Sequence, residues 1–451
     1  MAQDLYSVTT QDIKEPPKTF WDRLRHLGPG IIMSASIVGS GELIMTTTLG
    51  ARAGYVTLWV ILVSCLVKVI MQLEFGKHTI YAGVPALQSI NRFLPGLRVG
   101  PAHWTVYGWW SIQGLKLFQM GGIIGGVGQA LAIMFPVFNV ATWAIITGTT
   151  CTVLVAMGGY KFIERMSLSL LTLFTLFTLV CVIALQWTSY AIQWPDIASG
   201  FTFQLPAAAL GVALAAFGIT GAGADEIMAY TYWCVEKGYA RFTGPRDDSP
   251  VWFARARGWI RVMYLDALVS MVIYTVTTAA FYILGAAVLH GRGEIPQGYE
   301  MISTLSLMYT ESLGSSVQLL FLTGAVIVLF STLFSAMASW TRTWMDALAQ
   351  LRLINFQDVN TRSRTIVRLA IFFGIVWTSL FLFYEQPVYM VMMGGLATAA
   401  LLLLVTYVAF VYRYRLLPRE LGPGKFYDAA FWISAFSIAG VGIKAIVEAL
   451  S

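Results

Sequence analysis

The hydrophobic positions of this chain fall into long runs that short polar stretches separate. Eleven runs approach the length of about 20 apolar residues that a helix needs to cross a bilayer. They lie near residues 28–53, 56–80, 104–135, 140–157, 164–190, 207–235, 259–289, 314–349, 366–384, 387–413 and 426–449. The pattern predicts an all-α polytopic membrane protein, with a polar arm over residues 1–27 and a single membrane domain over 28–451.

Basic residues gather in every second loop between these runs. Lys77, Lys161, Lys237, Arg352 and Arg413 mark five loops on the same side as the basic N-terminal arm. Cytoplasmic loops of membrane proteins carry such an excess of lysine and arginine. We therefore expect a multi-pass protein of the plasma membrane, with the N-terminus in the cytoplasm and the C-terminus outside.

The first and sixth runs are each interrupted by glycines that stand next to acids. One interruption spans residues 36–42 and ends at Glu42, and the other spans 217–226 and ends at Asp225 and Glu226. Irregular backbone and buried carboxylates are tolerated at membrane depth only where they line a cavity or find partners. Interrupted helices in corresponding halves of a chain indicate the substrate site of a transporter.

The spacing of the two interruptions divides the membrane domain into repeats. Each interrupted run opens a set of five, over 28–190 and 207–413, and the odd offset makes the two sets inverted in the membrane. This is the layout of the LeuT-type fold. The eleventh run, 426–449, is an addition outside the repeats.

Composition excludes several other classes of protein. Of the 451 residues, 57% are hydrophobic and only 12% charged, and the net charge of +6 is explained by the loops, so we expect no nucleic-acid partner. The four cysteines lie in or at the ends of apolar runs without CxxC spacing, which argues against disulfides and zinc. The sequence has no GxxxxGK[ST] loop and no evident catalytic group. We predict no enzyme activity and no cofactor.

Three stretches at the start of the chain carry a family resemblance. They are Gly28-Pro29-Gly30, the sequence 49–55 after the first interruption, and the sequence 71–76 at the end of the second run. This frame resembles the Nramp (natural resistance-associated macrophage protein) family of divalent-metal transporters, most strongly over residues 27–83. The resemblance implies a divalent-metal carrier.

The chain departs from that family at its metal-binding motifs. The Asp-Pro-Gly-Asn motif of the family falls on residues 39–42, which places Gly39 and Glu42 where the family has Asp and Asn. The Met-Pro-His motif falls on about Ala222-Gly223-Ala224, so the thioether and the histidine are missing. The chain therefore resembles a divergent branch, with magnesium-transporting relatives as the better analogy.

The candidate site consists of hard oxygen donors, which suit Mg²⁺ or Mn²⁺. We expect Glu42 and Asp225 to be the metal ligands. Further ion-binding candidates are Glu226, the hydroxyls of Ser40 and Thr220, and carbonyls near Gly39 and Ala222. The glycines also have a simpler interpretation as close-packing residues, and Asp225 or Glu226 as a helix cap.

Other polar residues inside the runs have a structural and a functional interpretation. Lys116 in the third run is expected to pair with one acid, which leaves two negative charges for a divalent ion, with Gln113 nearby. Asp266 is either a structural group or part of an ion path. Two further expectations are that Lys68 and Glu74 extend toward the membrane surface, and that Arg342 pairs with Asp346 four residues later.

These observations predict a monomeric secondary transporter that moves a hard divalent cation by alternating access. The missing histidine and Lys116 argue against proton coupling. Two alternatives stay open. One is a carrier of a small organic solute, an amine or amino acid, on the same fold, and the other is a channel or a non-transporting relative.

Overall fold

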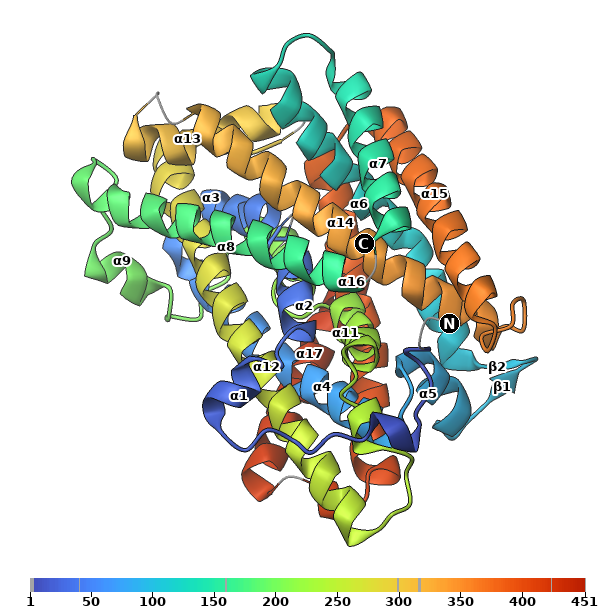
Figure 1. Cartoon of the computed structure of the whole chain (residues 1–451). Coiled ribbons are helices and arrows are strands. Elements are labelled where there is room, and N and C mark those ends of the chain that lie inside the picture. The colour runs from blue at the N-terminus through green and yellow to red at the C-terminus, as the bar shows by residue number, and fades with distance from the viewer. Residues whose placement is uncertain are drawn as a thin grey trace.

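The computed structural model describes residues 4–39, 41–158, 160–297, 300–314, 318–422 and 424–450. Within these ranges the chain is almost entirely helical (Figure 1). A hairpin of two short strands, β1 (Arg98–Val99) and β2 (Ala102–His103), is the exception. Nine helical segments of the described residues are long and apolar enough to cross a membrane. The prediction of an all-α membrane protein is confirmed.

The long helices follow the predicted runs closely. Unbroken helices fall on eight of the runs: α4 (Leu58–Ala82), α6 (Trp104–Met134), α7 (Val140–Met157), α8 (Tyr160–Ala184), α12 (Pro250–Leu284), α15 (Val359–Tyr384), α16 (Pro387–Val411) and α17 (Lys425–Leu450). The eighth run, 314–349, falls on a further unbroken helix, α14 (Gln318–Gln350), and α13 (Met301–Leu313) precedes that run. The apolar segment Pro29–Ala82 contains both the first and the second predicted runs. The total of eleven crossings stays a prediction.

The first and sixth runs are the broken ones. The first consists of α2 (Pro29–Ile37), a π-helical turn (Gly41–Thr46) and α3 (Thr47–Ala53). The sixth consists of α10 (Leu210–Ile219) and α11 (Ala224–Lys237). Short helices complete the fold: α1 (Phe20–Leu24), α5 (Ala86–Phe93) and α9 (Trp194–Ser199).

Several helices begin where the local sequence supplies a cap. Asn139, Ser249 and Asp358 precede α7, α12 and α15, and each side chain accepts a hydrogen bond from a backbone amide of the first turn. Such caps satisfy amides that the helix itself leaves unpaired. The helix boundaries are therefore fixed by local chemistry as well as by hydrophobic length.

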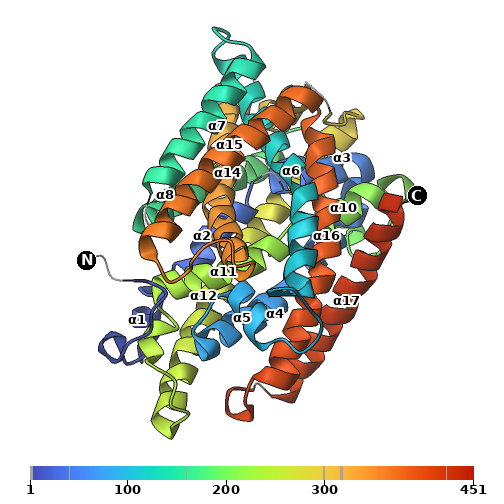
Figure 2. The same cartoon turned by 90° about the vertical axis from the view of Figure 1, so that its right-hand side faces the viewer.

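The broken helices form the centre of the bundle. Helices α2 and α11 pack against each other and against α14, and they lie near the middle of the molecule in Figure 1. Helix α12 packs on α2 and α4, and α6 packs on α14 and α16. At the periphery α7 lies beside α15, and α17 covers α16 (Figure 2). Apolar side chains such as Ile375 and Phe436 are exposed on these outer helices, as expected of a surface that faces lipid.

The N-terminal arm lies against one end of this bundle. The Tyr6 hydroxyl donates to Glu236 at 2.8 Å, and Lys14 N donates to the carbonyl of Phe242 at 3.0 Å. Glu236 also accepts from Arg342 Nε at 2.6 Å. The arm is thus tied to the end of α11 by a buried acid.

The expected pair between Arg342 and Asp346 is wrong. Arg342 reaches Glu236 on α11, while Asp346 accepts hydrogen bonds from Tyr232 and Gln350. Arg342 is paired by a contact between helices, and Asp346 accepts one hydrogen bond from α11 and one from Gln350 on its own helix. A spacing of four residues allows a pair without requiring it, because each side chain has other partners within reach.

Asp266 on α12 fixes the start of α2. Its carboxylate accepts from Gly28 N at 2.9 Å, from Gly30 N at 2.7 Å and from the Tyr230 hydroxyl at 2.9 Å. These amides belong to the first turn of the helix, where no intrahelical partner exists. Asp266 therefore caps α2 from a neighbouring helix and lies apart from the two breaks.

We expect Asp266→Ala to destabilise the protein. It leaves two buried amides without an acceptor, at about 1–3 kcal/mol for each unsatisfied group. The apparent melting temperature in detergent should fall by several degrees, and Asp266→Asn should recover part of the loss. The control is Val272→Ala, at a position 56% exposed on the same helix. Equal melting temperatures for Asp266→Ala and Val272→Ala would show that the cap is unimportant.

Candidate functional site

The break in the sixth run places two acids at a helix start. Helix α10 ends at Ile219, Gly221 has a φ of +68°, and α11 begins at Ala224. The positive φ is a conformation that glycine adopts without strain. Asp225 and Glu226 therefore stand in the first turn of α11, where the helix dipole favours negative charge.

The break in the first run holds the third acid. The chain leaves α2 at Ile37, and a Cβ at Gly39 would meet Thr332 Oγ1 at 1.5 Å, so no larger residue fits there. The Glu42 carboxylate turns back to accept from Gly39 N at 3.1 Å and from Thr278 Oγ1 at 3.2 Å. Glu42 is completely buried. Its carboxylate therefore pairs with a backbone amide inside the break in which Glu42 lies.

A small polar cavity lies between the two breaks. The volume open to the centre of a water-sized sphere is about 20 Å³. One water needs about 10–15 Å³ by this measure. The cavity thus has room for at least one particle of that size. Its walls are polar, and they include Ser36, Lys116, Gln119, Asp225, Glu226, Thr332, Trp340 and Thr398.

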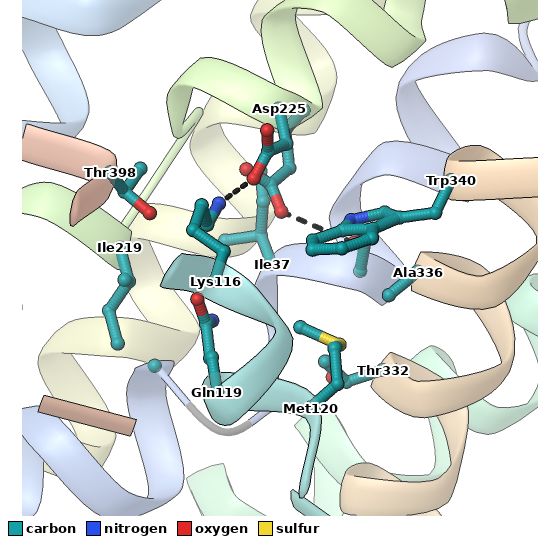
Figure 3. A pocket seen from close by; sticks show the side chains of 13 residues that line it. Ile37, Lys116, Gln119, Met120, Ile219, Asp225, Thr332, Ala336, Trp340 and Thr398 are labelled. Carbon is teal, nitrogen blue, oxygen red and sulfur yellow. Dashed lines mark hydrogen bonds and ion pairs between the residues drawn. The ribbon is translucent and has the colours of Figure 1, made fainter. Parts of the chain in front are cut away.

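Lys116 and Asp225 form an ion pair across this cavity. Figure 3 shows Lys116 on α6 pointing toward Asp225, with Trp340 on one side of the cavity and Thr398 on the other. The Gln113 side chain donates a second hydrogen bond to Asp225. Both charged side chains are more than nine-tenths buried. The charge of Asp225 on α11 is therefore balanced by a lysine on another helix, α6.

Glu226 is the second acid that lines the cavity. No lysine or arginine nitrogen of the described residues lies within 4 Å of its carboxylate, and Ser36 Oγ donates to it at 3.4 Å. The Gln119 side-chain oxygen also lines the cavity without a hydrogen-bond donor in the described ranges. One ammonium and two carboxylates leave one net negative charge. The cavity is suited to a cation.

The structure groups only part of the predicted site. It brings together Asp225, Glu226, Lys116 and Gln113. Among the described residues that line the cavity, Glu42, Gly39, Thr220 and Ala222 are not found. Ser40 lies outside the described residues. The two acids that the sequence suggested as joint metal ligands, Glu42 and Asp225, therefore occupy separate surroundings.

Lys68, like Glu74, was expected to extend toward the membrane surface but is completely buried. Lys68 lies under the end of α10. Its ammonium donates to the carbonyls of Phe217, at 2.7 Å, and of Thr220. A lysine in the middle of an apolar run was the available signal. The central position of Lys68 in the run indicates burial more strongly than the length of its side chain indicates contact with the membrane surface.

The described residues contain no group of three or more His, Cys, Asp or Glu side chains that could hold a metal ion. The candidate site is therefore a cavity with two adjacent carboxylates, an amide oxygen and hydroxyls. These are hard donors, which suit a hard cation.

Comparison with protein families gives one match along almost the whole chain. The family model described as natural resistance-associated macrophage protein-like matches residues 30–448. A relative named divalent metal cation transporter MntH 1, from Pseudomonas aeruginosa, is 25% identical over 289 residues. That alignment covers 62% of this chain and 61% of the relative, so the chain spans about three fifths of the relative's length.

Other relatives and solved structures give the same picture. A divalent metal cation transporter MntH from Mycobacterium tuberculosis is 26% identical over 70% of this chain and 68% of its own length. The crystal structure of a manganese transporter from Eremococcus coleocola superposes with a TM-score of 0.73 at 16% identity, over 98% of this chain and 91% of that one. MhsT in complex with L-phenylalanine gives a TM-score of 0.56 at 16% identity, over 96% and 99%. At these identities the structures establish the fold alone.

The buried pair predicts a specific pattern of stabilities. Lys116→Met leaves the Asp225 carboxylate unpaired, and breaking a buried pair from one side costs about 3–5 kcal/mol. Adding Asp225→Asn should restore much of the apparent melting temperature, because the charge left alone is then removed. Melts of both single variants and the double variant test this. Additive losses would mean that the two side chains are not coupled.

Proposed function

The chain belongs to the Nramp family, and on that premise we propose that it is a secondary transporter that moves a hard divalent cation by alternating access. The family match extends the resemblance found over residues 27–83 to residues 30–448. The LeuT-type fold predicted from the two interrupted runs is likewise confirmed by the structural neighbours. The cargo, the coupling and the site residues are our proposals.

One observation supports the choice of an inorganic ion above others. The cavity between the breaks accepts a water-sized particle, and two carboxylates from one helix start line it. An amino acid or amine with several heavy atoms does not fit this volume. In alternating access, a small cavity of this kind midway through the membrane domain matches a small ion.

Charge determines how a divalent ion would be held. With Lys116 on Asp225, the cavity has one net negative charge, which is too little for an ion of charge +2. We propose that the entering ion displaces Lys116 from Asp225. Asp225 and Glu226 then supply two carboxylates, and Gln119 supplies an amide oxygen. This donor set is hard, so we propose Mg²⁺ or Mn²⁺ as cargo.

Glu42 and Lys116 have separate parts in this proposal. Glu42 holds the first break in shape through Gly39 and does not bind the ion. Lys116 acts as a counter-ion that keeps the empty carrier stable. Since Lys116 occupies the place of a cation, we propose that inward transport needs no co-transported proton. We further propose a monomer in the plasma membrane with its N-terminus in the cytoplasm.

A monovalent organic cation is the second candidate. The single net negative charge of the resting cavity balances one ammonium group without moving Lys116. Amines and amino acids with several heavy atoms require the cavity to widen, because its volume of about 20 Å³ suits only a small particle. Competition between Mn²⁺ and methylammonium for the same site distinguishes the two.

We expect Glu226→Gln to lower the apparent affinity for Mn²⁺ about tenfold or more, because a charged ligand is lost. Glu42→Gln should change uptake much less, since a glutamine oxygen can still accept from Gly39 N. Saturable Mn²⁺ and Mg²⁺ uptake into proteoliposomes measures both. Glu294→Gln, in an exposed loop, is the matched control.

The opposite ranking would overturn the site. Uptake that survives Glu226→Gln but is abolished by Glu42→Gln would mean that the ion binds at the first break, beside Glu42. Flux that does not saturate with concentration would indicate a channel. Uptake of methylammonium with no effect of Mn²⁺ would favour the organic-cation carrier.

A further inference from the structure

The end of α10 is built like a cation site. A helix leaves its last carbonyls without intrahelical donors, and the helix dipole makes this end partly negative. Here the break at residues 220–223 leaves these carbonyls in the buried interior of the protein. The carbonyls of Phe217, Gly218 and Thr220 all turn toward one point.

The Lys68 ammonium occupies that point. It lies 2.7 Å from the carbonyl oxygen of Phe217 and 3.3 Å from that of Gly218, and it also donates to Thr220. Ser64, one turn earlier on α4, adds a hydroxyl 3.0 Å from the Phe217 carbonyl and 3.1 Å from the Thr220 carbonyl. The shell around the charge is therefore neutral oxygen on several sides.

A carboxylate partner is missing from this shell. No carboxylate oxygen of the described residues lies within 4 Å of the Lys68 nitrogen, and the residue is 0% exposed. Glu226 and Glu42 act on its charge only from beyond that distance. A buried lysine normally has an acid beside it, because an unpaired charge is costly to bury. Rings of carbonyls without acids are instead the way in which proteins hold alkali cations.

We propose that this cradle is a monovalent cation site that the chain fills with its own ammonium. Lys68 takes the place of a bound Na⁺ or K⁺ and holds α10 against α4. The broken helix therefore needs no alkali ion to keep its shape. The three carbonyls are also withdrawn from the transported ion, which leaves its coordination to the side chains of the neighbouring cavity.

The test replaces the tethered cation by a free one. Lys68→Ser shortens the side chain and leaves oxygen donors around an empty, negative cradle. We expect its apparent melting temperature to rise by about 2–5 °C when NaCl or KCl replaces N-methylglucamine chloride at equal ionic strength. Methylammonium chloride should also stabilise this variant. The wild-type protein should melt at one temperature in all four salts.

Lys68→Met is the matched variant, because its side chain removes the charge but still fills the space. It should melt lower than the wild type and show no preference among the salts. A folded Lys68→Ser that melts alike in every salt would refute the proposal. A wild type that Na⁺ or K⁺ stabilises over N-methylglucamine would refute it too, whether or not Lys68→Ser folds. These melts contain no divalent cation, so their outcome does not depend on whether the proposed transport function is correct.

Discussion

Unsatisfied backbone at the helix breaks is the constraint on which this structure depends. Inside a membrane, water is not available to pair with the freed amides and carbonyls, so side chains must do so. Lys68 donates to carbonyls at the end of α10, and the Glu42 carboxylate accepts from Gly39 N. Asp266 accepts from backbone amides at the start of α2. Each of these charged side chains comes from the interior of an apolar segment. The breaks are therefore stable because buried charges, which are costly alone, find backbone partners there.

This constraint also determines which acids remain for a substrate. Glu42 accepts a hydrogen bond from the backbone of its own break, and Asp225 forms an ion pair with Lys116. Glu226 is left with one weak hydroxyl contact at 3.4 Å. Counting acids in the sequence gives a strongly negative site, whereas the folded cavity has one net negative charge. Under the proposed function, an ion of charge +2 would be held only if the pair between Lys116 and Asp225 opens, and Lys116 would then take part in binding.

The fold was largely predictable from the sequence, and the site only in part. Hydrophobic run length determines the helices, and glycines beside acids mark both breaks, because these signals are local. Partner choice is not local: Lys68 lies 149 residues before Phe217, and Arg342 takes an acid 106 residues away instead of Asp346. Sequence spacing cannot rank such contacts, since they depend on how whole helices pack. For the same reason Glu42 and Asp225 were placed together, although the first break turns Glu42 toward its own backbone.

The position of the cavity indicates how a bound ion would leave. A second cavity, of about 10 Å³, shares Ser36, Asp225, Glu226, Ala336 and Trp340 with the first and continues along α11 to Trp233. Further along the same helix, Glu236 binds Arg342 and the Tyr6 hydroxyl of the N-terminal arm. Trp233 and then Glu236, with Arg342 bound to it, thus follow one another along α11 from the cavity toward this end of the bundle. Because side chains rearrange at lower cost than packed helices, an exit along α11 would begin at Trp340 and finish at the Glu236 contacts, with the arm leaving last.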